Sequence, residues 1–174
     1  MLLVHYVGDI HQPLHVGAVY LDANGQIVNP DMGTFDPDTD TRGGNSISVK
    51  GGSTKLHALW DQIPESLTVS HVDPELLNLA KAVPVTHGQV YDWPASWAGD
   101  TLGEARQAFD GIKFGSVQNG RNIHWSATLP VDYSARMDDI KKTQLVKAGA
   151  RLAQLLEAIW PPGTSIAGGS AIPK

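Results

Sequence analysis

The sequence predicts a mainly α-helical protein with one short β-hairpin excursion. Helical patterns bounded by proline or by capping residues cover residues 2–12, 74–82, 94–109, 131–160 and the stretch from Ser53 to Pro64. A hairpin is indicated where two short apolar runs flank the turn sequence Asp22-Ala-Asn-Gly25. At 174 residues the chain is long enough for one domain, which we expect to span residues 1–162, and it contains no internal repeat.

The first elements follow directly from the proline and turn positions. Residues 2–12 have the pattern of the last turns of a helix, and Pro13 should end it because proline cannot donate a backbone hydrogen bond. The hairpin should then span Gly17 to Val28, with strands at Val19–Leu21 and Gln26–Val28.

A long polar segment separates the hairpin from the next helix. Residues 29–44 carry Asp31, Asp36, Asp38 and Asp40, but they lack the glycine and bidentate glutamate of a calcium loop, which favours a solvated acidic loop. Residues 46–50 alternate as a short strand, and Ser53 or Thr54 should cap the helix that follows. At the other end of the chain, the Gly/Ser/Ala-rich residues 163–174 predict a disordered tail.

Composition limits the classes of function. The chain has 174 residues, a net charge of −5 and no run of Lys or Arg, which disfavours nucleic-acid binding unless bound metal supplies positive charge. It contains no cysteine, so disulfides are excluded. The opening run Met1-Leu-Leu-Val4 is too short for a signal peptide or a membrane span, and no signal-peptide pattern follows it.

Two His/Asp pairs and one further histidine have the spacing of metal ligands. They occur in His5-Tyr-Val-Gly-Asp9-Ile-His-Gln-Pro-Leu-His15 and in Leu56-His57-Ala-Leu-Trp-Asp61. Positions i and i+4 lie on one face of a helix, and imidazole with carboxylate is a ligand set of hydrolytic zinc. A surface ion pair is the alternative for either pair alone. The apolar neighbours of both pairs favour metal, because buried imidazoles and carboxylates are costly unless they are paired or metal-bound.

Four histidines fall outside this pattern, at positions 11, 71, 87 and 124. His11 lies on a different helix face from Asp9, and His71 and His87 flank proline-containing connections. His124 precedes Trp125, which suggests packing. We expect all four to be surface or structural residues.

The chain resembles the nuclease S1/nuclease P1 family, which includes the plant bifunctional nucleases. The similarity rests on the first His/Asp string, on Arg42-Gly-Gly-Asn45, on Leu56 to Asp61, on Trp97-Ala-Gly-Asp-Thr101, on Leu129-Pro-Val-Asp-Tyr133 and on residues 144–153. The resemblance implies the helical zinc-hydrolase fold of the phospholipase C/single-strand nuclease type. It also implies a secreted or periplasmic enzyme that binds no membrane.

The resemblance also implies roles for individual residues. His5 and Asp9 match ligands of one zinc ion, and Asp9 matches the carboxylate that bridges to a second ion, which makes Asp9 the candidate catalytic residue. His15, His57 and Asp61 match the complete protein ligand set of a third ion. The family's remaining ligands lie upstream of the position that matches Met1, so we expect this chain to lack an N-terminal part.

Asn45 is the candidate substrate-binding residue, because the Gly-Gly-Asn segment of the family lies at the nucleotide pocket. A turn in which Asn45 satisfies only local geometry is the alternative. Tyr20 and Phe35 are aromatic side chains that could stack a base.

The function implied by the resemblance is zinc-assisted hydrolysis of single-stranded DNA and RNA to 5′-phosphorylated products, with removal of phosphate from 3′-nucleotides. Two alternatives stay open. A zinc phospholipase C shares the first string, although its second pair ends in Glu where this chain has Asp61. An inactive remnant could bind one zinc ion through His15, His57 and Asp61. The sequence leaves base preference and oligomeric state undetermined.

Overall fold

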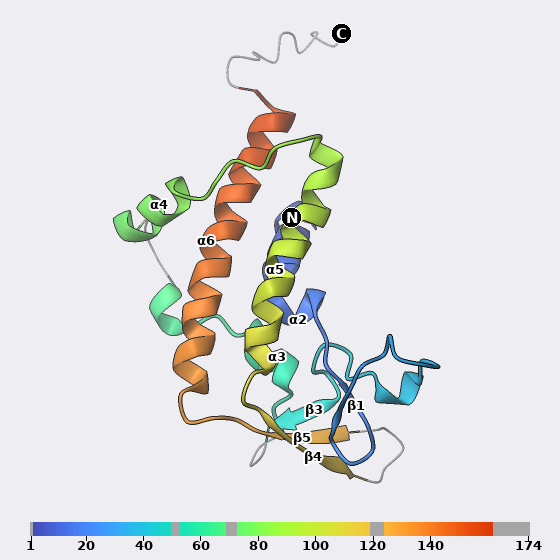
Figure 1. Cartoon of the computed structure of the whole chain (residues 1–174). Helices are drawn as coiled ribbons and strands as arrows, with labels where there is room; N and C mark the ends of the chain where they lie inside the picture. The colour runs from blue at the N-terminus through green and yellow to red at the C-terminus, as the bar shows by residue number, and fades with distance from the viewer. Residues whose placement is uncertain (1, 50–52, 69–72, 119–123, 162–174) are drawn as a thin grey trace, which may run out of the picture.

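The computed structural model describes residues 2–49, 53–68, 73–118 and 124–161. Two long helices, α5 (Trp93–Phe109) and α6 (Tyr133–Ile159), run along the length of the molecule (Figure 1). Helix α1 (Leu2–His11) packs against both of them. The short strands gather at one end, below the helices in the view of Figure 1.

The predicted mainly α-helical class is confirmed. Besides the three helices above, the structure contains α2 (Pro13–Val16), α3 (Leu56–Asp61) and α4 (Pro74–Lys81), the last of which packs on α6. Single turns of 3-10 helix lie at Pro37–Thr39, Glu65–Leu67 and Val90–Asp92. The helices predicted at residues 2–12, 74–82, 94–109 and 131–160 therefore form almost to their expected bounds.

The β-hairpin is confirmed, but a second sheet was not predicted. Strands β1 (Tyr20–Leu21) and β2 (Ile27–Val28) pair antiparallel across the Asp22–Gly25 turn. The predicted strand near residue 47 is β3 (Ile47–Val49), which pairs in parallel with β5 (His124–Thr128). Strand β4 (Lys113–Gln118) completes the sheet in the order β3-β5-β4.

Two helix boundaries differ from the prediction. The cap of α3 is Lys55, with no side-chain hydrogen bond, rather than Ser53 or Thr54. The reason is that the chain before α3 still pairs with β3, since the carbonyl of Thr54 accepts from the Val49 amide. Pro13 opens α2 instead of only ending α1, because proline suits the first helical position.

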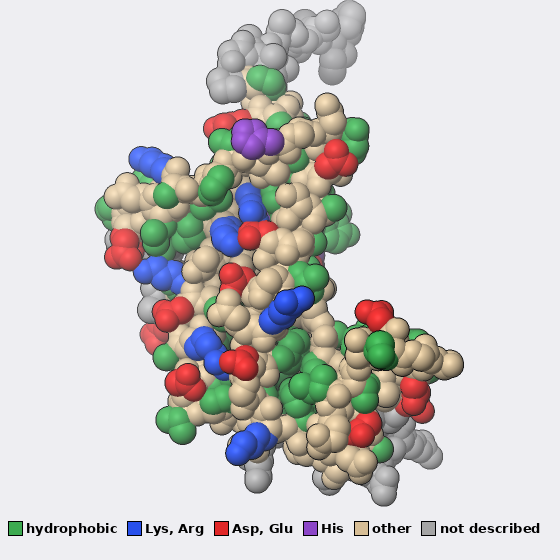
Figure 2. Space-filling model, in the orientation of Figure 1, with side chains coloured by type: hydrophobic (Ala, Val, Ile, Leu, Met, Phe, Trp, Pro, Cys, Tyr) green, Lys and Arg blue, Asp and Glu red, His purple; other side chains and the backbone are tan. Residues whose placement is uncertain are grey.

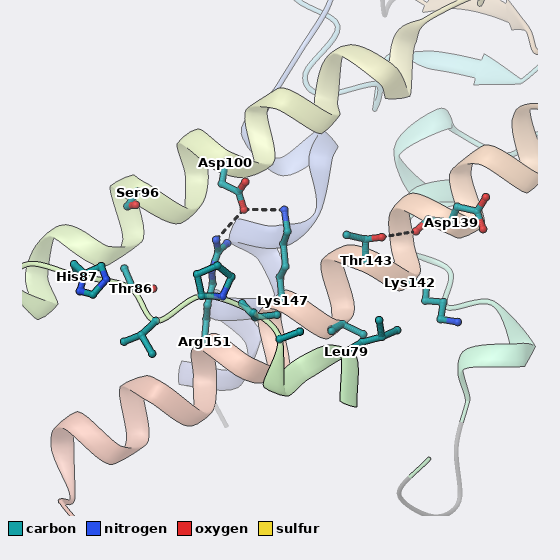
Figure 3. A pocket seen from close by; sticks show the side chains of 15 residues that line it. Leu79, Thr86, His87, Ser96, Asp100, Asp139, Lys142, Thr143, Lys147 and Arg151 are labelled. Carbon is teal, nitrogen blue, oxygen red and sulfur yellow. Dashed lines mark hydrogen bonds and ion pairs between the residues drawn. The ribbon is translucent and has the colours of Figure 1, made fainter. Parts of the chain in front are cut away.

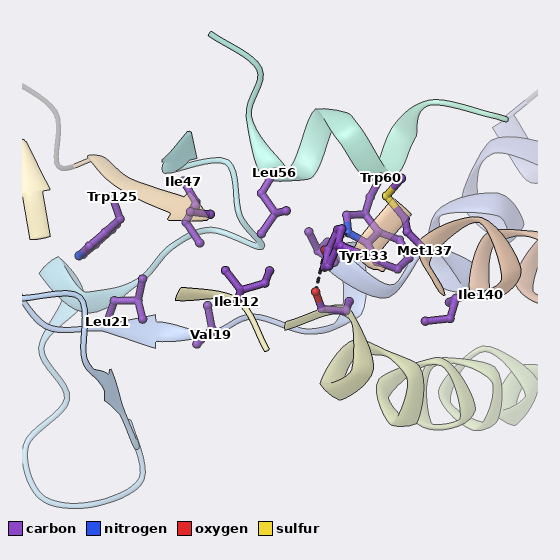
Figure 4. Close-up of a cluster of buried hydrophobic side chains, with 13 residues drawn as sticks. Val19, Leu21, Ile47, Leu56, Trp60, Ile112, Trp125, Tyr133, Met137 and Ile140 are labelled. Atoms are coloured by element: carbon purple, nitrogen blue, oxygen red, sulfur yellow. Dashed lines mark hydrogen bonds between the residues drawn. The ribbon is translucent and has the colours of Figure 1, made fainter. Parts of the chain in front are cut away.

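Two hydrophobic clusters hold the helices and the sheet together. The larger one joins the sheet end to α3 and the start of α6 through side chains drawn in Figure 4, among them Leu21, Ile47, Leu56, Trp60 and Tyr133. In this cluster the Trp60 indole donates to the Tyr133 hydroxyl at 2.9 Å, and that hydroxyl donates to the Ala108 carbonyl at 2.7 Å. Burial raises the pKa of Tyr133 to about 12. This core fixes α3 against the rest of the molecule.

The second cluster lies where α1 meets α5 and α6, and it consists of Val7, Trp93, Trp97 and Ala148. No helix within the described ranges combines the length and apolarity that a membrane crossing requires. The tail predicted to be disordered, residues 163–174, lies outside the described residues.

Candidate metal centre

Three of the predicted metal ligands lie close together in the structure. His15 comes from α2, whereas His57 and Asp61 lie one turn apart on α3. One ligand atom from each residue lies within 4.8 Å of the other two. The Asp61 carboxylate is 3.5 Å from His15 Nε2 and 3.7 Å from His57 Nε2. The two imidazole rings meet edge to face, with centroids 4.7 Å apart. We call these three residues the triad.

A glycine loop brings α2 and α3 together. Gly43 and Gly44 have φ angles of 58° and 86°, which side chains disfavour. A Cβ on Gly43 would lie 2.2 Å from the Leu14 carbonyl oxygen, so only glycine allows this loop to lie against α2. The Gly-Gly sequence thus has a structural reason, which is the close approach of the chains that carry His15 and His57.

The same loop orients His57. The Nδ1 atom of His57 donates to the Gly43 carbonyl at 2.8 Å, which leaves Nε2 with its lone pair facing Asp61 and His15. Metal-binding histidines are commonly fixed by such a bond from the other ring nitrogen. The His57 side chain is only 12% exposed, compared with 34% for His15 and 49% for Asp61. The triad therefore combines an anchored imidazole with two ligands that reach solvent.

The donor set fits zinc. Tetrahedral zinc with ligands at 2.0–2.1 Å would place neighbouring ligand atoms about 3.4 Å apart. His15 Nε2 lies 3.5 Å from Asp61 Oδ1 and His57 Nε2 lies 3.7 Å from Oδ2, both near that value although they involve different oxygens, and one atom from each residue lies within 4.8 Å of the others. Two imidazoles and one carboxylate also form the three-ligand set that leaves a position open for substrate or water.

Lys141 supports the triad from α6. Its ammonium group donates to the carbonyls of Leu59 and Gln62 at 2.8 and 2.7 Å, at the end of α3. Burial lowers the pKa of Lys141, and the charges of Asp138 and Asp61 oppose this shift. The free carbonyls at a helix C-terminus are favourable partners for a cation. Nothing in the sequence pattern indicated this residue, because its contacts lie about 80 positions away.

The first His/Asp pair is built differently. His5 Nε2 lies 3.3 Å from Asp9 Oδ2, and both residues belong to α1 alone. Their side chains are 67% and 31% exposed. A cavity of about 490 Å³ joins the pair to the triad, because His5, Asp9, His15 and Asp61 all line it. The fold thus places the two predicted clusters around one cavity.

Asn45 is exposed, and its side chain makes a local contact. The amide donates to the Arg42 carbonyl at 3.0 Å. Tyr20 and Phe35, the aromatic side chains considered for base stacking, pack edge to face against each other with centroids 6.0 Å apart. The local-turn alternative for Asn45 is consistent with this bond, and its role toward substrate stays a prediction.

The spare histidines stay outside the triad where the structure describes them. His11 is buried, donates from Nδ1 to the Val7 carbonyl at 2.7 Å and faces the Arg151 guanidinium at 2.9 Å. Burial, aided by Arg151, lowers the pKa of His11, so the ring is neutral near pH 7. His124 Nδ1 lies 3.3 Å from Lys55 Nζ, and His71 is outside the described residues.

A larger cavity, with a volume of about 1010 Å³, lies elsewhere, between α4, α5 and α6 (Figure 3). Asp100 lines it and pairs with both Lys147 and Arg151, at 3.0 and 2.8 Å. Burial acts to raise the pKa of Asp100, but the two cations outweigh burial and lower it. None of the predicted metal ligands reaches this cavity.

The face drawn in Figure 2 shows acidic and basic side chains interspersed, without a continuous basic patch.

The family model and the curated proteins that match this chain are all nucleases. The S1/P1 Nuclease family model matches residues 1–161. Endonuclease 1 of Arabidopsis thaliana is 27% identical over 179 aligned residues, which cover 98% of this chain and 52% of that protein. Endonuclease 4 of the same plant is 28% identical over 168 residues, covering 92% of this chain and 50% of that protein. The chain therefore spans about half the length of the curated relatives it matches. No solved structure matches it significantly.

Proposed function

Because this chain belongs to the S1/P1 nuclease family, we propose that it is a zinc-dependent phosphodiesterase acting on single-stranded DNA and RNA. The proposal includes 5′-phosphorylated products, 3′-nucleotidase activity and a secreted or periplasmic location. The relatives named endonucleases support the reaction class. The observation that carries the proposal is the triad, in which α2 and α3 bring three ligand atoms within 4.8 Å of one another.

In this proposal His15, His57 and Asp61 hold one zinc ion. A bound zinc ion supplies positive charge that polarises a phosphoryl group and makes water a better nucleophile at neutral pH. The chain's own residues have defined tasks. Gly43 keeps the His57 ring oriented, and the partly exposed His15 and Asp61 place the charge at the cavity wall.

His5 and Asp9 are proposed ligands of a second metal position in the same cavity, with Asp9 as the bridging, catalytic carboxylate. They supply two ligands, and catalytic zinc sites usually have three from protein. If Asp9 bridges two ions, Asp9→Asn should lower nuclease activity more than Asp61→Asn does. The reverse order would argue against the bridging role. Asn45 remains the proposed contact to the base.

The test loads the chain with zinc and compares four substrates: single-stranded DNA, double-stranded DNA, a 3′-nucleotide and phosphatidylcholine. We expect zinc-dependent cleavage of single-stranded DNA to 5′-phosphorylated fragments and release of phosphate from the 3′-nucleotide. The matched control is His57→Ala, which removes one triad ligand. Hydrolysis of phosphatidylcholine alone would replace the nuclease with a phospholipase C-like enzyme.

A second candidate is a protein that binds one zinc ion without turning substrate over. It is favoured by one observation: among the described residues, only the triad gathers three ligand atoms. Elemental analysis separates the two candidates. Two or three zinc ions per chain with activity support the enzyme, whereas one zinc ion without activity supports the binding protein.

A further inference from the structure

Gln12 links the two helices that carry the triad. It stands between α1 and α2, directly before Pro13, and is the N-terminal cap of α2. Its side-chain oxygen accepts from the Leu14 amide, and its backbone carbonyl accepts from the His15 amide at 3.0 Å. Its side-chain nitrogen donates to Asp61 Oδ1 on α3 at 2.8 Å.

The two ends of the Gln12 amide are fixed by different partners. The oxygen is held by the start of α2, so the nitrogen must point toward α3. Reversing the amide would place an oxygen against the Asp61 carboxylate and a nitrogen against the Leu14 amide, and both contacts would be lost. The donor therefore reaches Asp61 in one orientation only.

Asp61 needs such a partner. Its side chain is 49% exposed, and a carboxylate with that much access to water can occupy several rotamers. Gln12 donates to Oδ1 at 2.8 Å, and His15 Nε2 lies 3.5 Å from the same oxygen, while His57 Nε2 lies 3.7 Å from Oδ2. Lys141 holds the α3 backbone rather than the Asp61 carboxylate. Gln12 is therefore the neutral hydrogen-bond donor that sets the direction of the Asp61 carboxylate.

We infer that Gln12 is a positioning residue for the candidate zinc centre, which orients Asp61 and ties it to the helix of His15. This inference rests on the proposed function, because it requires zinc at the triad. Hydrogen bonds to ligating carboxylates typically change metal affinity 10- to 100-fold. We expect loss of the Gln12 donor to weaken zinc binding by a factor in that range.

Two substitutions separate the two tasks of the side chain. Gln12→Asn keeps a good helix cap but is too short to reach Asp61, whereas Gln12→Met removes both the cap and the donor. Asp73→Ala is the matched control, because Asp73 caps α4 in the same way, by accepting from the Glu75 amide, away from the triad. Zinc affinity of the full chain is measured by competition with a chelator. Melting of the metal-free protein and circular dichroism report on the fold.

The expected result is about 10-fold or greater loss of zinc affinity in Gln12→Asn and Gln12→Met, and no loss in Asp73→Ala. Metal-free melting should fall in Gln12→Met and Asp73→Ala, but little in Gln12→Asn. Unchanged affinity in Gln12→Asn would overturn the inference, even if Gln12→Met were impaired, because a cap alone would then explain the residue.

The wild-type protein and His57→Ala are measured in parallel. Zinc binding that is lost in His57→Ala but unaffected by Gln12→Asn would refute the role of Gln12 and leave the proposed function standing. Wild-type protein that fails to bind zinc would overturn both.

Discussion

The molecule contains the same His/Asp spacing twice, and the two copies differ in what surrounds them. His57 and Asp61 sit on a helix fixed by the sheet-end core, with a glycine loop against the imidazole and Lys141 on the helix end. His5 and Asp9 sit on α1, with exposed fractions of 67% and 31%. The i, i+4 spacing therefore places two side chains on one helix face. A three-ligand site forms only where another element brings a third ligand to that pair.

The two His/Asp pairs should differ most in zinc content. We expect His57→Ala to lose about one zinc equivalent per chain, because it removes one of three protein ligands. His5→Ala should keep that equivalent. At a zinc concentration 1,000 times the dissociation constant, binding stabilises the fold by about 4 kcal/mol, so only His57→Ala should lose the zinc-induced rise in melting temperature. Elemental analysis and thermal melting provide the measurement, and unchanged zinc in His57→Ala would refute the triad.

Two glycines give the next largest contrast. Gly43→Ala should destabilise the metal-free protein by about 3 kcal/mol, because it forces a side chain into a positive φ. Its Cβ would also meet the Leu14 carbonyl at 2.2 Å. Gly8→Ala, between His5 and Asp9 on α1, meets nothing within 4 Å and should be neutral or stabilising by about 0.5–1 kcal/mol. Urea unfolding measures both changes. Equal effects would mean that the loop is not strained in the way described.

The lysines of α6 allow a finer test. Lys141→Met should cost about 2 kcal/mol, because two carbonyls at the end of α3 lose their charged donor while the stem still packs. Lys142→Met is the matched control, since Lys142 forms an ion pair with the exposed Glu75 at the surface. We expect the control to change stability much less. A larger loss in Lys142→Met would contradict the support of α3 by Lys141.

The smallest effect concerns His11, the histidine of the first string that joins neither metal cluster. Its folded pKa is lowered, chiefly by burial, from about 6.5 in the unfolded chain. Below that value the unfolded chain binds the extra proton, so the stability associated with His11 is present above about pH 6.5 and lost as the pH falls through the folded pKa. The charged groups that act on it are Arg151 and Lys147, which lower its pKa, and Asp100, which opposes them.

Melting temperatures of the metal-free protein at about pH 7.5 and about pH 5.5 test this directly. In wild type the melting temperature should fall between these values, and the fall should be smaller in His11→Gln. The exposed His87→Gln is the control and should behave like wild type. An identical fall in His11→Gln and wild type would contradict the assignment.

Local patterns predicted most of the helices, since Pro13, Asp73-Pro74 and Pro161-Pro-Gly163 mark their ends. The same patterns could not predict the β3-β5-β4 sheet. Trp125 and Ala127 alternate with polar neighbours, but β5 has only five residues and finds its partner at Ile47. The sequence spacing of the ligands could not predict that His15 lies beside His57 either, because this depends on the backbone angles at Gly43. A side chain that donates to backbone carbonyls of another element, as Lys141 does, leaves no pattern in the sequence.

The parallel pairing of β3 with β5 has a consequence for the order of folding. Ile47 of β3 is paired with Trp125 of β5, so β3 cannot pair until β5, which is synthesised much later, is available. Contacts of such long sequence separation close slowly, whereas single helices form within microseconds. Helix α3 has six residues, too few to be stable by itself, so His57 and Asp61 should be held one turn apart only once the sheet and its core have formed. A ribosome-bound chain that stops before residue 124 should therefore lack the finished sheet.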